Sequence, residues 1–361
     1  MMLSFEEKKE QLVNVLKELA KREFSYIIAA DTLRKNGFTG NGYPRFINKI
    51  RSLDESEINE KNITNSFLEL SDILNNYIKF GNKKITIFRF NSSELNTIQT
   101  NLESSLNFLS YTKEDFNLLE NSEVKRSYQF KTSLETDDSI YYYFNIDRNY
   151  YERQVVTDEN RMNEIGGVLH LQHKDEIFKV ITYTKVWVTA FDFIKVDYKN
   201  SIVVLGQDLS TLLDKTQRNK DYANLTVILA NCLGIHPTEL KALDLKPALS
   251  KFENEKLGRI VEHQFSSSNQ KFNHSTKVSA LEDVRDDNFY KTGNQKEKLD
   301  YFGICKNYKE KTTAINVTLT IRLPLKLYNA SPLNPIYEAL IDDALSLESF
   351  EYGIERIIEK L

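Results

Sequence analysis

The stretch from Ile165 to Gly206 constrains the fold most, because it contains four short runs rich in Val, Ile, Phe, Tyr, Trp and Thr. β-Branched and aromatic residues are typical of strands. Polar residues separate the runs, among them Lys174-Asp175 and the sequence Asp-Tyr-Lys-Asn at 197–200. Short runs between polar turns indicate consecutive antiparallel strands. The stretch therefore predicts a meander at the centre of a sheet.

The alternation inside this stretch predicts a sheet that is covered on both faces. From Phe178 to Val188, every second residue is Phe, Val or Thr, and the residues between them include Ile181, Tyr183 and Trp187. Successive side chains of a strand point to opposite faces, so both faces carry apolar groups. Such a sheet packs against helices or a second sheet on each side. Trp187, the single tryptophan, is expected near its centre.

The first part of the chain carries helical patterns. Apolar residues recur at helical spacing from Ser4 to about Glu23, behind a Ser4-x-x-Glu7 capping box. A second helix is predicted from Ser25 to Asn36, ending at Gly37, and Pro44 suits the first turn of a third helix. Short helices with a glycine-rich turn before the third are compatible with a helix-turn-helix or winged-helix unit.

We predict an α+β fold in two parts, because 361 residues exceed the size at which one core grows comfortably. A helical subdomain, helix-turn-helix-like, is expected at 1–80. A larger body at 81–361 is expected to hold a mainly antiparallel sheet covered by helices. The body contains the central meander at 165–206 and a C-terminal strand-helix segment at 315–361. Further predicted elements are strands at 83–90, 139–146, 258–265 and 316–323, a helix at 222–233, a helix from Pro237 broken at Pro247, and amphipathic helices within 332–361.

The clearly basic stretch lies between Ala20 and Ser52, where seven Lys and Arg against two Asp and Glu give a net +5. The whole chain has a formal net charge of -4, so a nucleic-acid contact requires a local patch. Cationic side chains off the apolar stripe of the third helix suit phosphates and base edges. A solvated face of a plain helical subdomain is the alternative interpretation. The candidate nucleic-acid contacts are Arg34, Lys35, Arg45, Asn48, Lys49 and Arg51.

The tyrosines at 141–143 place phenol rings on both faces of a predicted strand. They suit either a platform for unstacked bases or core packing, and we favour packing.

Asp192, Asp197 and Lys199 form the sharpest catalytic pattern. Asp197-x-Lys199 follows an apolar run, and this is similar to the arrangement by which metal-dependent nucleases hold Mg²⁺ and position a water. The chemistry requires carboxylates that converge on the cation. The same residues also fit a polar turn between two strands. No other metal site is expected, because His170 and His173 would point to opposite faces of a strand.

Recognisable motifs for nucleotide or nucleophile chemistry are absent, since the chain has no P-loop, GxGxxG or GxSxG. An enzyme is therefore the less favoured interpretation, and no cofactor is expected beyond Mg²⁺ for a nuclease.

Cys232 and Cys305 are predicted to be free thiols, which indicates a reducing, cytoplasmic location. No window approaches the ~20 apolar residues of a membrane span, so no membrane contact is expected.

The sequence thus predicts a cytoplasmic microbial protein that binds DNA or RNA and that has a protein partner or forms a homo-oligomer. Microbial chains of this size without housekeeping motifs are often parts of phage-defence or mobile-element systems, and that expectation comes from the class of chain alone. Two alternatives stay open: a Mg²⁺-dependent nuclease, and a protein-binding scaffold without nucleic-acid contact.

Overall fold

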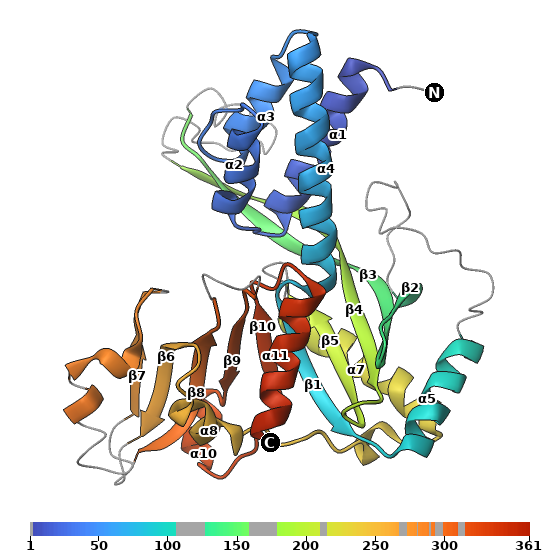
Figure 1. The fold of residues 1–361 in the computed structure, drawn as a ribbon, viewed down its shortest axis with the longest axis vertical. Coiled ribbons are helices and arrows are strands. Elements are labelled where there is room, and N and C mark those ends of the chain that lie inside the picture. The colour runs from blue at the N-terminus through green and yellow to red at the C-terminus, as the bar shows by residue number, and fades with distance from the viewer. Residues whose placement is uncertain are drawn as a thin grey trace, which may run out of the picture.

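The computed structural model describes residues 3–105, 127–158, 179–209, 215–266, 273–279, 281–288, 290–292, 299–309 and 315–361. Within these ranges the chain folds into helices around a ten-stranded sheet in which every pairing is antiparallel (Figure 1). The predicted α+β class is confirmed.

Residues 5–80 form the N-terminal helical unit, which consists of α1 (Phe5–Lys21), α2 (Tyr26–Lys35), α3 (Tyr43–Arg51) and α4 (Glu57–Phe80). Ser4 and Glu7 form the capping box that begins α1. Gly37 follows α2 with a left-handed φ of 82°, which glycine adopts without a Cβ clash. Pro44 lies in the first turn of α3. The three predicted helices are confirmed, and Figure 1 shows α4 running from this unit down to the sheet.

The sheet has the strand order β2-β3-β4-β5-β1-β10-β9-β8-β6-β7. Its two halves meet where β1 pairs with β10. The strands are β1 (Lys83–Arg89), β2 (Gln129–Glu135), β3 (Ser139–Val156), β4 (Val180–Asp197), β5 (Ile202–Asp208), β6 (Arg259–Ser266), β7 (Asn273–Lys277), β8 (Asp300–Asn307), β9 (Thr318–Arg322) and β10 (Ala339–Asp342).

The described part of the predicted meander is a single hairpin, in which the long strand β4 is followed by β5. β4 pairs with β3 along its whole length and then turns after Asp197 into β5, so the predicted polar turn is confirmed. The meander before Lys179 lies outside the described residues. β4 is buried on both faces only near its inner end, while most side chains from Val180 to Trp187 are exposed or half-buried. The prediction of two covered faces is therefore wrong for the outer half of β4, because that half extends beyond the body.

Helices cover both faces of the inner strands. α5 (Ser92–Ser105) and α7 (Lys215–Leu233) pack on one face of the first half. α4, α8 (Ala248–Asn254) and α11 (Leu347–Lys360) pack on the other face, across both halves, and the short helix α10 (Leu325–Ala330) follows β9. The tyrosines at 141–143 are fully buried and divided between the two cores. The preference for core packing is confirmed.

Two predicted helices are wrong, one of them only in its first part. The segment with Leu340 and Ile341 forms β10, because pairing with β1 and β9 on either side overrides its helical spacing. Of the helix expected from Pro237 and broken at Pro247, the first part is wrong, because it forms only the 3₁₀ turn η3 (Pro237–Glu239), whereas the part after Pro247 is confirmed as α8. Between them the backbone bonds to the sheet region instead, with Leu243 N donating to Ile87 O at 2.8 Å.

Candidate nucleic-acid interface

Helix α3 presents a cationic surface from the N-terminal unit. Phe46 and Ile50 bury its inner side, while Arg45, Asn48 and Lys49 are exposed. Their spacing of three and four residues places these three side chains on one side of the helix. Among the described residues, no acidic side chain pairs with Arg45 or Lys49. We call Arg45, Asn48 and Lys49 the α3 face.

The remaining predicted contacts are placed differently. Arg34 pairs with Asp31 at 3.3 Å within α2, and Arg51 turns toward α1, where it pairs with Glu10 at 3.1 Å. Lys35 is exposed at the end of α2, with no acidic partner in the described part of the chain. The structure therefore brings three of the six predicted residues onto one surface.

Arg22, which contributes to the predicted net +5, does not reach the surface. Its side chain is fully buried, donates to the carbonyl oxygen of Thr189 and lies 3.4 Å from Asp208. The surface charge of the helical unit is therefore lower than the residue count predicts. Charge counts overestimate a patch whenever one of its members anchors the unit to the rest of the protein.

Arg22 belongs to a buried ionic network between the helical unit and the first half of the sheet. The Arg148 guanidinium contacts Asp192 on β4, and its Nε donates to Asp221 on α7 at 2.7 Å. The backbone N–H of Asp208 donates to Asp192 at 2.8 Å. Buried charges are tolerated only when they are paired and hydrogen-bonded, so this network holds elements together. Its charged members are Arg22, Lys83, Arg148, Asp192, Asp208 and Asp221.

The structure does not bring Asp192, Asp197 and Lys199 together. Asp192 and Asp197 are five residues apart on β4, so they point to opposite faces of the sheet. Lys199 is exposed in the turn and pairs with Glu355 at 3.0 Å. A Mg²⁺ site needs converging oxygen ligands, and these positions do not supply them. In the described ranges, no group of three or more His, Cys, Asp or Glu is placed to hold a metal ion.

Asp197 is instead part of the polar turn between two strands, which was the alternative to a Mg²⁺ site. It pairs with Lys195 at 2.9 Å and accepts a hydrogen bond from the backbone N–H of Asn200 at 2.9 Å. Burial opposes ionisation of Asp197, but Lys195 and Asn200 together lower its pKa below the ordinary value. The carboxylate is thus ionised and fully engaged in the structure of the turn. His170 and His173 lie outside the described residues.

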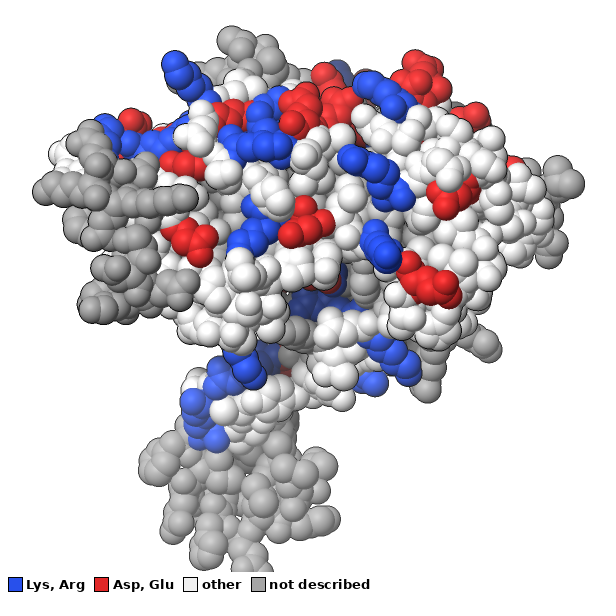
Figure 2. All heavy atoms as spheres, turned by 90° about the horizontal axis from the view of Figure 1, so that it is seen from below, with Lys and Arg blue, Asp and Glu red and all other residues white. Residues whose placement is uncertain are grey.

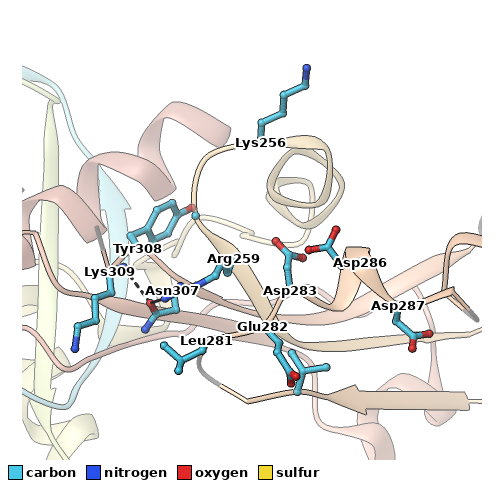
Figure 3. Close-up of a pocket in the computed structure, with 12 residues that line it drawn as sticks. Lys256, Arg259, Leu281, Glu282, Asp283, Asp286, Asp287, Asn307, Tyr308 and Lys309 are labelled. Carbon is cyan, nitrogen blue, oxygen red and sulfur yellow. Dashed lines mark hydrogen bonds between the residues drawn. The ribbon is translucent and has the colours of Figure 1, made fainter. Parts of the chain in front are cut away.

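A cavity of about 730 Å³ lies between β6 and the 3₁₀ turn η4 (Val284–Asp286) (Figure 3). Its charged lining does not converge. Glu282 and Asp283 point in opposite directions, and Lys256 and Lys309 extend away from the cavity on different sides. Asp283 is engaged by Arg285, whose guanidinium donates to it at 2.6 Å. These polar groups do not define a shared reaction centre.

The outer halves of β3 and β4 form a two-stranded arm that the sequence did not reveal as a surface. Figure 2 shows this arm projecting from the body with Lys and Arg along it, while acids and bases are interspersed over the rest of that side. The register pairs Tyr151 with Lys185 and Arg153 with Tyr183, so these side chains share one face. We call this the outer arm face, and its described members are Asn149, Tyr151, Arg153, Val155, Ile181, Tyr183, Lys185 and Trp187.

A sequence signal for this face exists in the alternation from Lys179 to Trp187, which puts large apolar and basic residues on one side. We interpreted this alternation as a sheet covered on both faces, because alternation alone does not show whether a strand continues past its neighbours. Among the described strands, β3 alone accompanies β4 that far.

The molecule is thus an α+β protein with a helical unit, a long antiparallel sheet and a projecting arm. Comparison of its sequence with protein-family models and with curated proteins found no match. None of the helices that the structure describes is both long and apolar enough to span a membrane. Cys232 and Cys305 are free thiols, as the sequence predicts.

Proposed function

We propose that this protein binds nucleic acid through the α3 face. The observation that carries the proposal is the exposure of Arg45 and Lys49 on one side of a helix, with Asn48 between them and with no acidic partner in the described part of the chain. A solvated helix face commonly pairs its cations with nearby carboxylates, as Arg34 and Arg51 do here. Cations left unpaired on one face suit a polyanion.

The chemistry of the α3 face fits a phosphate backbone with an adjacent base. Each Lys or Arg that neutralises a phosphate releases counterions, which makes binding favourable and sensitive to salt. Asn is the side chain that recognises adenine through two hydrogen bonds. The first turn of α3 contains no acidic residue, so nothing there opposes the approach of a phosphate to the positive end of the helix.

Other expectations stay predictions, because no observed contact bears on them. They are a protein partner or homo-oligomer, a cytoplasmic location, and a place in a phage-defence or mobile-element system. A nuclease is not proposed, since Asp192 and Asp197 point to opposite faces of the sheet.

Charge reversal of the α3 face tests the proposal. The double variant Arg45→Glu/Lys49→Glu should lose retention of nucleic acid in an electrophoretic shift at low salt. For duplex DNA, the slope of log affinity against log salt should become shallower by about 2, because each neutralised phosphate contributes about 0.9. The measurement uses single- and double-stranded DNA and RNA, with and without Mg²⁺.

A matched control separates the α3 face from total charge. Lys241→Glu/Lys326→Glu changes the net charge equally at exposed positions in the C-terminal part of the chain. It should leave retention unchanged. Equal losses in both variants, or wild-type retention in the α3 variant, would show that the α3 face is not the binding surface.

A further inference from the structure

We infer that the outer arm face binds unpaired nucleotides, with bases stacked on Tyr151, Tyr183 and Trp187 and phosphates held by Arg153 and Lys185. This inference rests on the proposed function and narrows it, because it assigns a second surface and a substrate class, single-stranded nucleic acid. Proteins that bind single strands without sequence readout combine aromatic platforms with a cationic track. The outer arm face contains both.

The exposure of the two tyrosines is the first observation, while Trp187 at the base of the arm is half-buried. Tyr151 is 63% exposed and Tyr183 is 62% exposed, although both are large side chains on a strand. Val155 and Ile181 extend the same surface at 47% and 40%. A contiguous apolar surface of this kind on a projecting element marks a site of interaction.

The two faces of the arm differ in their surroundings. On the opposite face, Val156 and Val188 are buried and Tyr150 is half-buried. That face is therefore the more covered of the two. Because side chains alternate along a strand, the outer arm face carries the exposed rings of the arm and is the face that a ligand reaches.

The charges of the outer arm face select the ligand. Arg153 and Lys185 are both exposed, and no member of this face is acidic, whereas the opposite face carries Glu152. A second copy of the chain docked through the same face would bring these cations against their own counterparts, since a two-fold contact repeats one patch on both sides. A polyanion whose bases have apolar faces matches the cations and the rings at once.

The register arranges the rings in a staggered row. Tyr151 lies opposite Lys185, which is midway between Tyr183 and Trp187 on β4. Diagonal neighbours across an antiparallel pair are about 7–8 Å apart, within reach of aromatic side chains. The Lys185 ammonium lies over the face of the Trp187 ring, 4.6 Å from its centre. A base that stacks on Trp187 therefore takes the other face of the ring or displaces Lys185 toward a phosphate. Successive bases and phosphates can follow the row.

Trp187 provides the test, because it is the single tryptophan of the chain. Oligothymidylate titrated into the full-length protein should quench its fluorescence by stacking. Inorganic polyphosphate, which has charge but no bases, should not. The variant Tyr151→Ala/Tyr183→Ala should weaken oligothymidylate binding by roughly five- to a hundredfold per ring. Tyr151→Phe/Tyr183→Phe keeps the rings and should bind like wild type.

Two control variants make failure of this inference distinguishable from failure of the proposed function. Gln154→Ala/Thr184→Ala alters exposed side chains on the opposite face of the same arm and should not change binding. Arg45→Glu/Lys49→Glu should reduce duplex retention while quenching of Trp187 by oligothymidylate persists.

Several outcomes overturn the inference. If the Tyr→Ala double variant binds oligothymidylate like wild type, the outer arm face is not the site, and duplex retention that still depends on the α3 face leaves the proposed function standing. If the wild-type protein binds neither single-stranded nor double-stranded nucleic acid, both this inference and the proposed function are wrong. If the Tyr→Ala variant loses only self-association in analytical ultracentrifugation, the outer arm face is a contact between copies.

Discussion

Arg148 carries its charge in the interior of the protein, where its guanidinium contacts Asp192, Asp221 and the carbonyl oxygen of Asp208. The hydroxyl of Tyr128 also donates to Asp192. Each acid in this group therefore serves two or more partners. Removing one member leaves its partners in the interior with only part of their compensation.

The first residue-scale prediction concerns this network. Asp192→Ala should lower the free energy of unfolding by about 3–5 kcal/mol, because it removes one of the two carboxylates that pair with the buried Arg148 guanidinium and leaves only Asp221. Urea unfolding measures the loss. A cycle with Arg148→Ala is the control, and the double variant should be less unstable than the sum of the single variants. Additive losses would mean that the two side chains act independently.

A second residue-scale prediction concerns His263, which is fully buried on β6. Burial lowers its pKa to about 4, and nearby Arg285 acts in the same direction. The unfolded state, with a histidine pKa of about 6.5, binds more protons between these values. The unfolding free energy should therefore fall as the pH drops from about 6.5 to about 4.

The variant His263→Phe isolates this contribution. It should show a weaker loss of stability than wild type across that pH window in urea titrations. Glu253 lies 3.3 Å from His263, and burial raises its pKa, so its own contribution has the opposite sign. The comparison keeps Glu253 in both proteins. Identical pH profiles for the two proteins would show that the pKa of His263 does not differ between the folded and unfolded states.

At the level of elements, local chemistry predicts the N-terminal helices well and the central strand β10 poorly. The capping box at Ser4, the glycine at 37 and Pro44 each act on their own neighbours, so the N-terminal helices follow from sequence. β10 does not, because its partners β1 and β9 lie elsewhere in the chain. A segment whose apolar residues have helical spacing forms a strand here, because β1 and β9 hydrogen-bond to it on either side.

The element-scale prediction concerns the packing of β4 against β5. A Cβ built on Gly206 would lie 2.0 Å from Cε1 of the Phe193 ring, so this strand position admits only glycine. Gly206→Ala should cost about 1–3 kcal/mol of unfolding free energy through overpacking. Gly234→Ala is the control, since it has a φ of 66° but open space around it, and should cost about 1 kcal/mol. A smaller loss at Gly206 than at Gly234 would contradict the steric explanation.

For the whole molecule, the sequence predicted that a cationic surface exists better than it predicted which residues form that surface. The α3 face follows from the local spacing of its polar residues. Arg34 and Arg51 do not join it because they pair with Asp31 and Glu10, and Lys35 lies at the end of α2. Arg22 and Asp192 could not be recognised as buried, because residues far away in the chain enclose them. The arm escaped prediction because strand length relative to neighbours is a property of the assembled sheet.

The pairing of β1 with β10 also determines when each edge of β1 can acquire its partner during synthesis at the ribosome. β1 gains β5 once the chain reaches Asp208, but its other edge, from Lys83 to Ile85, stays open until residues 339–341 have been made. The N-terminal half must therefore persist during translation with an unpaired edge at what becomes the middle of the sheet. Lysines on a strand edge discourage pairing with foreign strands. Lys84 lies at that edge, whereas the Lys83 side chain is buried in the ionic network. Lys84 therefore discourages pairing with other strands until residues 339–341 have been made.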